Sequence, residues 1–179
     1  ITISAGSTTG TVSFTPTDDS VYEGNETATI AISSVTGEAS ESGTQAVTIT
    51  ITENESAPTV TLSVSATSIA ENAGTSLTLT ATLSGATDEA VTVALSTSGT
   101  ATEGTDYTDG SGNVDDITIS AGSTTGTVNF TPTDDSVYEG NETATIAISS
   151  VSGGSATESG SQSVTITITD NELSLIHIS

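Results

Sequence analysis

The chain of 179 residues carries 23 acidic residues, one histidine and no lysine or arginine, which gives a formal net charge of −23. This balance excludes a basic patch for nucleic acid or for an anionic membrane surface, and it makes cations the natural partners. Cysteine is absent, so disulfides and thiolate metal sites are excluded together.

The chain begins with a block that occurs twice. Residues 1–34 recur as residues 117–150 with one difference, Ser13 against Asn129, at an offset of 117 − 1 = 116 residues. A period of this length corresponds to a whole domain, because solenoid repeats are only about 20–50 residues long. The chain is therefore predicted to be part of a tandem array of domains.

The repeat divides the chain into three parts. Residues 1–57 are predicted to be the C-terminal half of a domain that is truncated at its N-terminus, and residues 58–172 a complete domain. Residues 173–179 depart from the repeat, and we expect them to be a sequencing artefact or a strand of the next domain. This tail contains His177, to which we assign no catalytic or metal-binding role.

Within the complete domain, apolar residues alternate with Thr and Ser in short segments separated by turn-forming residues. Such alternation is typical of strands with one buried and one exposed face, and no stretch supports a helix. The pattern predicts about seven strands, at residues 60–64, 77–83, 91–95, 117–119, 128–130, 144–148 and 164–168.

This pattern favours an all-β fold, an antiparallel two-sheet sandwich of the immunoglobulin-like kind, with an up-and-down barrel as the alternative. Aromatic residues make up only 3% of the chain, so the core is predicted to consist of Val, Ile, Leu and Ala, and a bound metal would add stability. In residues 1–57 the core face would be bare. We expect upstream sequence, or another subunit that donates strands, to complete it.

Acidic residues gather at the predicted strand ends of the complete domain. Neighbouring carboxylates repel one another unless a cation lies between them, as at Asp134 and Asp135 with Glu139 nearby. The chain has no Lys or Arg side chain that could be this cation. Calcium takes about six to eight oxygen ligands, magnesium prefers to keep its waters, and zinc prefers His or Cys. The pattern therefore predicts a calcium site formed by loops that converge at one end of the sandwich.

Four segments carry a resemblance to a known family. The sequences ENAG at 71–74, GTDY at 104–107, DDSVYEGNET at 134–143 and a last strand ending in DNE at 170–172 resemble a Calx-beta domain. This is a calcium-binding sandwich of sodium/calcium exchangers, of an integrin beta subunit and of large bacterial surface proteins. The resemblance covers residues 59–172 completely and residues 1–55 as a C-terminal half.

The resemblance implies which residues bind calcium. In the complete domain they are Glu71, Asp106, Asp134, Asp135, Glu139 and Asp170, with Glu142 and Glu172 as weaker candidates. In the first copy the matching residues are Asp18, Asp19, Glu23 and Glu53, while counterparts of Glu71 and Asp106 would lie before Ile1. Family members often end in a run of Asp, whereas this chain has Asp-Asn-Glu at 170–172 and Glu-Asn-Glu at 53–55.

The remaining acidic residues fit an ordinary solvated surface. They are Glu38, Glu41, Asp88, Glu89, Glu103, Asp109, Asp115, Asp116 and Glu158. Asn25, Asn54 and Asn141 each begin an N-glycosylation sequon, so glycans are a possible addition, although these triplets overlap the predicted calcium motifs.

The function predicted is that of a calcium-stabilised structural repeat in a long extracellular or cell-surface protein, an adhesin stalk or fibre. Ions bound near 170–172 and 53–55 would stiffen the junctions, because the connector at 56–58 is short. The alternatives are an adhesive module that binds a ligand and a calcium-sensing regulatory domain. An enzyme is not expected, because the sequence lacks Cys, Lys, Arg, a nucleophile elbow and a phosphate loop.

Overall fold

The computed structural model describes residues 1–173 and divides the chain into two compact units. The first unit consists of Ile1–Ser20 and Gly24–Glu53, and the second of Val21–Glu23 and Asn54–Ser179. Residues 174–179, with His177 and most of the predicted tail, lie outside the described residues. Among the described residues, no helix has the length and apolar character needed to cross a membrane.

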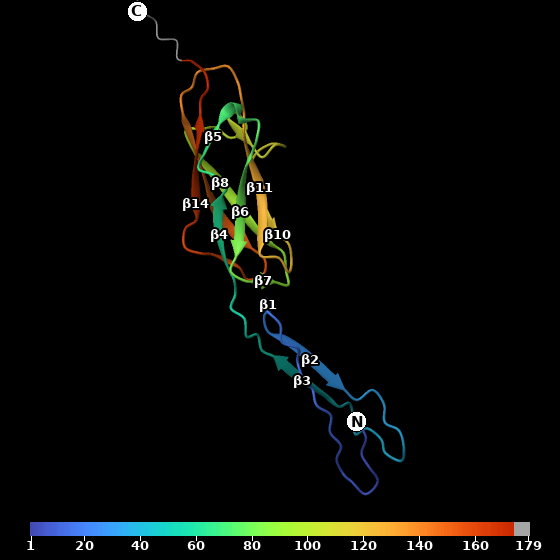
Figure 1. The fold of residues 1–179 in the computed structure, drawn as a ribbon. Coiled ribbons are helices and arrows are strands. Elements are labelled where there is room, and N and C mark those ends of the chain that lie inside the picture. The colour runs from blue at the N-terminus through green and yellow to red at the C-terminus, as the bar shows by residue number, and fades with distance from the viewer. Residues whose placement is uncertain (174–179) are drawn as a thin grey trace, which may run out of the picture. The chain divides into compact units, whose positions relative to one another are not determined.

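The second unit is a sandwich of two five-stranded sheets (Figure 1). The strand order of one sheet is β10 (Ile117–Ile119), β8 (Val91–Gly99), β12 (Glu142–Ser152), β14 (Ser163–Thr169) and β5 (Ser68–Ala70). The order of the other is β13 (Thr157–Glu158), β4 (Thr59–Val64), β6 (Leu77–Leu83), β11 (Thr125–Pro132) and β9 (Tyr107–Thr108). The short strands β1 (Val21–Tyr22) and β7 (Ala86–Thr87) form a separate parallel pair. The predicted sandwich is confirmed, and the sheets do not close into a barrel.

Each of the predicted strand segments coincides with a strand of the second unit, and the additional strands of that unit are only two or three residues long. The prediction that no stretch forms a helix was wrong in one place. Glu71–Ala73 form a turn of 3₁₀ helix, η1, that ends at Gly74 with φ 62°. Two edge pairs, β13 with β4 and β14 with β5, are parallel, so the sheets are not purely antiparallel. The chain passes from one sheet to the other between β4 and β5.

The core of the second unit lies between its two sheets and consists mainly of aliphatic side chains. Strand β6 shows the cause, because its residues alternate between buried and half-buried positions along its whole length. One aromatic pair lies in this core, Tyr107 and Phe130, whose rings stack with centroids 4.6 Å apart. The alternation in the sequence therefore corresponds to the two faces of each sheet.

The first unit is different, although its sequence repeats part of the second. Its strands are β2 (Glu26–Ala31) and β3 (Ala46–Ile51), which form one antiparallel pair. Residues 1–20 contain no strand, whereas the same sequence forms β10 and β11 in the second unit. Phe14 and Ile30 are each 43% exposed, and their counterparts Phe130 and Ile146 are fully buried. The apolar face of this unit is thus uncovered.

Candidate metal centre

The register of the strands places two of the acidic residues side by side. Strand β14 runs parallel to β5, with Thr169 opposite Ala70. The residue that follows each strand is acidic, Asp170 after Thr169 and Glu71 after Ala70. These two carboxylates therefore leave the same end of the same sheet together.

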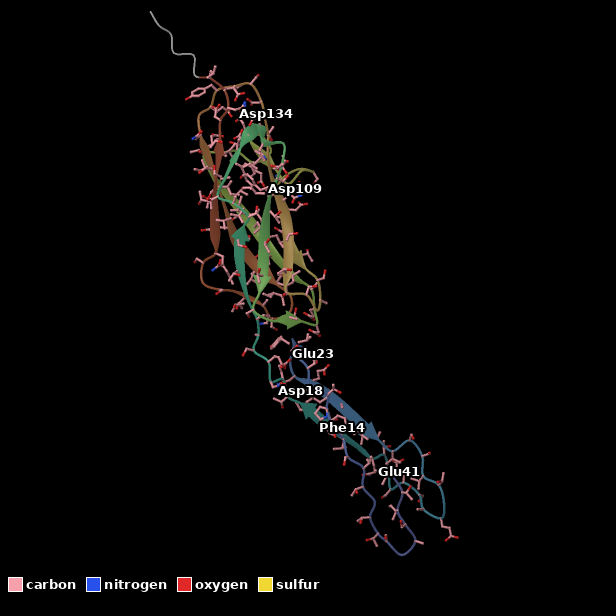
Figure 2. The ribbon with its side chains drawn as sticks, viewed as in Figure 1. Phe14, Asp18, Glu23, Glu41, Asp109 and Asp134 are labelled. Atoms are coloured by element: carbon pink, nitrogen blue, oxygen red, sulfur yellow. The ribbon has the colours of Figure 1, made fainter. Side chains whose placement is uncertain are left out.

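The other acidic residues reach that end by similar pairings. Glu142 begins β12 opposite Ile168, close to the end of β14. In the second sheet Pro132 lies opposite Tyr107, so that Asp106 precedes one strand and Asp134 follows the other. Figure 2 shows Asp134 beyond the strand ends at this end of the sandwich.

Two groups of carboxylates form there, and within each group the oxygen atoms lie within 4.8 Å of one another. One group is Glu71, Asp134 and Glu172, called the Glu71 cluster below, and the other is Asp106, Glu139 and Glu142, called the Asp106 cluster. Six of the predicted ligands are thus brought together, and they divide into two sites.

The Glu71 cluster contains buried oxygen atoms without hydrogen-bond donors. The side chain of Glu71 is only 8% exposed, and its Oε1 atom has no partner. The Oε2 atom of Glu172 is buried in the same way, also without a partner. A buried carboxylate oxygen without a donor is costly, and a bound cation removes that cost.

Burial and like charge change the acidity of these groups. Burial, followed by the neighbouring carboxylates of Glu172 and Asp170, raises the pKa of Glu71 from 4.5 to about 7. In the Asp106 cluster, desolvation and then the charge of Asp106 raise the pKa of Glu142. The pKa of Glu139 is raised for the same two reasons in the same order. In both clusters, burial and like charge therefore favour the protonated form of these carboxyl groups.

Asp170 lies beside both clusters but belongs to neither. Its Oδ2 atom accepts hydrogen bonds from the backbone N–H of Glu139, at 2.7 Å, and of Gly140. Its Oδ1 atom accepts from the N–H of Glu172 at 2.7 Å. Partial desolvation acts in the opposite direction, but these three donors hold the pKa of Asp170 below its usual value. This carboxylate therefore fixes the loop that carries Glu139.

In the first unit, Glu53 takes the place of Asp170 and binds the corresponding loop with a longer side chain. Oε2 of Glu53 accepts a hydrogen bond from the N–H of Gly24 at 2.8 Å. The N–H of Glu53 donates to Oδ1 of Asn25 at 2.8 Å, just as that of Asp170 donates to Asn141 at 3.3 Å. The strand-end carboxylate holds the same loop in both copies.

The remaining predicted ligands are not brought into either cluster. Asp135 caps its own turn, because its Oδ1 atom accepts from the N–H of Val137 at 2.7 Å. Neither cluster includes a residue of the first copy, where the predicted ligands were Asp18, Asp19, Glu23 and Glu53.

Some acidic residues that fitted a solvated surface instead hold loops together. Oε1 of Glu103 accepts from the N–H of Val114 at 2.7 Å, and its Oε2 accepts from Oγ1 of Thr97 at 3.0 Å. Oδ1 of Asp109 accepts from the N–H of Ser111 at 2.7 Å. The Asp-Gly-Ser-Gly sequence at 109–112 is a turn signal from which the hydrogen bond of Asp109 could have been predicted. The partners of Glu103 lie too far along the chain for any local signal.

Both clusters offer only oxygen ligands. Hard cations prefer carboxylates, and calcium in particular accepts irregular sets of them, whereas zinc and softer metals prefer nitrogen and sulfur. The donor-free oxygens of Glu71 and Glu172 are an independent sign that the carboxylates fit a cation. The residues present are therefore compatible with bound calcium.

Comparison with known proteins also indicates a calcium-binding domain. The Calx-beta domain family matches residues 1–55 and 53–172, which together span nearly all of the chain. The chain belongs to the Calx-beta family. Calx-beta is a calcium-binding, non-catalytic domain family, so the family and the calcium cofactor expected from the sequence are confirmed.

Solved structures similar to this Calx-beta chain include two from Calx. The apo-form CBD1 domain of Calx is 22% identical, with a TM-score of 0.50, and the match covers 63% of this chain and 97% of that domain. CBD12 from CALX1.2 is 22% identical, with a TM-score of 0.49, and the match covers 62% of this chain and 44% of that one. At this identity the first match shows the fold alone. No curated protein matches the chain.

Proposed function

We propose that this Calx-beta chain binds calcium at the Glu71 and Asp106 clusters and that the ions stabilise a structural repeat of a long extracellular protein. The observation that carries the proposal is the pair of buried, donor-free oxygens, Oε1 of Glu71 and Oε2 of Glu172. The chain has no Lys or Arg whose side chain could pair with them.

The chain's own residues would do three things at this site. The two clusters supply the carboxylates that bind the ions. Asp170 orients the loop that carries Glu139, and Asp135 shapes the turn that precedes it. When calcium is bound, its charge relieves the repulsion between the carboxylates.

A structural role in a stalk or fibre is supported by the repetition itself. Residues 1–34 and 117–150 differ at one position, and the connector at 56–58 is short. Near-identical neighbouring domains are typical of extended structural arrays, whereas calcium sensors usually consist of one or two divergent domains. Carboxylates at 170–172 lie where the chain leaves its last strand, so an ion held there would restrict the segment that follows. An extracellular location fits such an array, as do glycans on the sequons.

An adhesive ligand-binding module is the second candidate, because one apolar surface lies beside the metal centre. Val137 and Tyr138, in the loop between β11 and β12, are 58% and 54% exposed. Exposed aromatic side chains next to a metal centre are suited to contact with a ligand. If the loop served this role, Tyr138→Ser would abolish ligand binding without a change in calcium affinity.

Calorimetric titration of the full chain with calcium tests the main proposal. We expect Glu71→Gln with Glu172→Gln to remove the ion of the Glu71 cluster, and Asp106→Asn with Glu142→Gln to remove that of the Asp106 cluster. The matched control is Glu38→Gln with Asp88→Asn, which removes the same charge from exposed positions outside both clusters. If both cluster variants gave the binding isotherm of the unchanged chain, the proposed function would be refuted.

A further inference from the structure

The two metal clusters share one loop. Residues 133–141 connect β11 to β12, and they carry Asp134 of the Glu71 cluster and Glu139 of the Asp106 cluster. An ion bound by one of these two carboxylates restricts the backbone that carries the other. The two clusters are therefore not mechanically independent.

Asp170 forms a second link between the clusters. Its Oδ2 atom accepts hydrogen bonds from the backbone N–H of Glu139, at 2.7 Å, and of Gly140. Its Oδ1 atom accepts from the N–H of Glu172 at 2.7 Å. Glu139 belongs to the Asp106 cluster and Glu172 to the Glu71 cluster. One carboxylate thus fixes the backbone of one residue in each cluster.

These contacts commit both carboxylate oxygens of Asp170 to the protein backbone. A carboxylate has about four lone-pair positions, and three N–H donors occupy three of them here. The N–H of Asp170 also donates to Oδ1 of Asn141, at 3.3 Å, in the loop that carries Glu139. The geometry of Asp170 is therefore that of a positioning residue.

The sheet fixes Asp170 relative to carboxylates at the strand ends. Asp170 directly follows β14, which pairs with β5 on one side and with β12 on the other. Glu71 follows β5, and Glu142 begins β12. Each cluster therefore combines a carboxylate fixed by these strands with one on a segment that Asp170 holds, Glu172 in the Glu71 cluster and Glu139 in the Asp106 cluster.

We propose that Asp170 couples the two clusters, so that calcium bound at one raises the affinity of the other for calcium. The inference rests on the proposed function. The first ion orders the loop at 133–141 and, through Asp170, the segment at 170–172. The second ion then binds segments that are already ordered, so it meets less of the entropy cost of ordering them. By linkage, each site changes the affinity of the other by the same factor.

The charge of the two clusters also favours a second ion. Their six carboxylates carry a formal charge of −6 when ionised, and two calcium ions supply +4, so −6 + 4 = −2 remains. The chain has no Lys or Arg, so the second ion still meets a negative field after the first has bound. Repulsion between the ions is therefore offset by the carboxylates that they share.

A thermodynamic cycle on the full chain tests the coupling. Calorimetry measures the calcium affinity of the Asp106 cluster in the unchanged chain and in Glu71→Gln with Glu172→Gln, which removes the other ion. The loaded Glu71 cluster has a formal charge of −3 + 2 = −1, and the variant keeps only Asp134, also −1, so the local charge is matched. We expect the variant to lower the affinity of the Asp106 cluster at least about fivefold. The same affinity in both proteins would overturn the coupling.

The same cycle with Asp170→Asn assigns the coupling to this residue. Removal of the Glu71 cluster should then change the affinity of the Asp106 cluster by less than about twofold, as for independent sites. Asp170→Glu should retain the coupling, because Glu53 makes the corresponding contact to Gly24 at 2.8 Å. Asp109→Asn is the matched control, since Oδ1 of Asp109 also accepts backbone hydrogen bonds, but from residues of its own turn. Coupling of equal size in Asp170→Asn and Asp109→Asn would overturn the role of Asp170.

Amide hydrogen exchange gives a readout that does not depend on the second ion. In Asp106→Asn with Glu142→Gln only the Glu71 cluster remains. Calcium should still slow the exchange of the Glu139 and Gly140 amides, since the loop and Asp170 transmit the ordering. No slowing in this variant, at calcium concentrations that fill the Glu71 cluster, would overturn the coupling while leaving the proposed function intact. Absence of any calcium binding by the unchanged chain would refute the proposed function, and the coupling with it.

Discussion

At the residue scale, Glu71 shows how burial and neighbouring charge act on one carboxyl group of the proposed metal site. It is the first residue of η1, and its carboxyl is buried in a protein that has no Lys or Arg to pair with it. Its neighbours Glu172 and Asp170 are acidic too, so burial and charge act together to favour the protonated form. Under the proposed function, a metal ion and a proton would compete for the same oxygen atoms.

Glu71 predicts how the stability of the ion-free protein depends on pH. Its pKa is raised from 4.5 to about 7 on folding, so the folded state binds this proton more tightly than the unfolded state does. The corresponding stabilisation is complete below pH 4.5 and is lost as the pH rises through about 7. The free energy of unfolding of the ion-free chain should therefore fall across this interval.

Denaturant unfolding without calcium, at several pH values from 4.5 to 8, measures this dependence. Glu71→Gln should flatten the curve, whereas Glu38→Gln, at an exposed position of the first unit, should leave it unchanged. Calcium should reverse the trend for the unchanged chain, because deprotonated carboxylates bind the ion. A curve for Glu71→Gln as steep as that of the unchanged chain would mean that this carboxyl does not carry the effect.

At the scale of the elements, the loop between β11 and β12 depends on a residue that follows β14. Asp170 accepts backbone hydrogen bonds from Glu139 and Gly140 and so ties two segments together at one end of the sandwich. The same contact, made by Glu53 to Gly24, recurs in the first unit. A carboxylate at this position therefore has a structural role that does not depend on which acid supplies it.

We expect Asp170→Asn to destabilise the second unit by about 1–3 kcal/mol, because an amide nitrogen cannot accept a hydrogen bond and leaves a backbone N–H without a partner. The amides of Glu139 and Gly140 should also exchange faster with solvent. Thermal unfolding and amide exchange measure the two effects. Asp170→Glu is the control and should cost less, since Glu53 already makes this contact. Equal losses for both variants would show that the shape of Asp170, and not its acceptor oxygens, is what matters.

At the scale of the whole molecule, the chain carries its net charge of −23 without any opposing side chain. Self-repulsion of this kind opposes compact states, and salt screens it only over distances beyond about 8–10 Å. Carboxylates within 4.8 Å of one another are therefore poorly relieved by salt and strongly relieved by a bound ion. The molecule as a whole should respond to calcium far more than to ionic strength.

Chelation of calcium should lower the melting temperature of the full chain and broaden the range of conformations that it samples in solution. The physical reason is that the ions would hold loop and exit segments of the second unit in place. Calorimetry and small-angle scattering, each with calcium and with EDTA, measure the two changes. Sodium chloride at matched ionic strength is the control. Scattering curves that were identical with and without EDTA would contradict the stiffening role.

Several features could be predicted from the sequence because their physical cause is local. The alternation of apolar and polar residues reflects the two faces of a strand, so each predicted strand was found. The lack of basic residues, together with acidic residues at strand ends, was enough to predict a cation site. The short strands β1, β5, β7, β9 and β13 and the turn η1 were missed, because none of these segments of two or three residues shows apolar residues alternating with polar ones.

Other features were decided only by the tertiary structure. The division of the acidic residues into two clusters depends on register, which brings Glu71 and Glu172 together from distant parts of the chain. Residues 1–20 form no strand although the same sequence forms β10 and β11 in the second unit. A strand needs a neighbouring strand for its backbone hydrogen bonds and a facing sheet for its apolar side chains. Both are supplied by residues far away in the sequence, so only the folded chain determines where they meet.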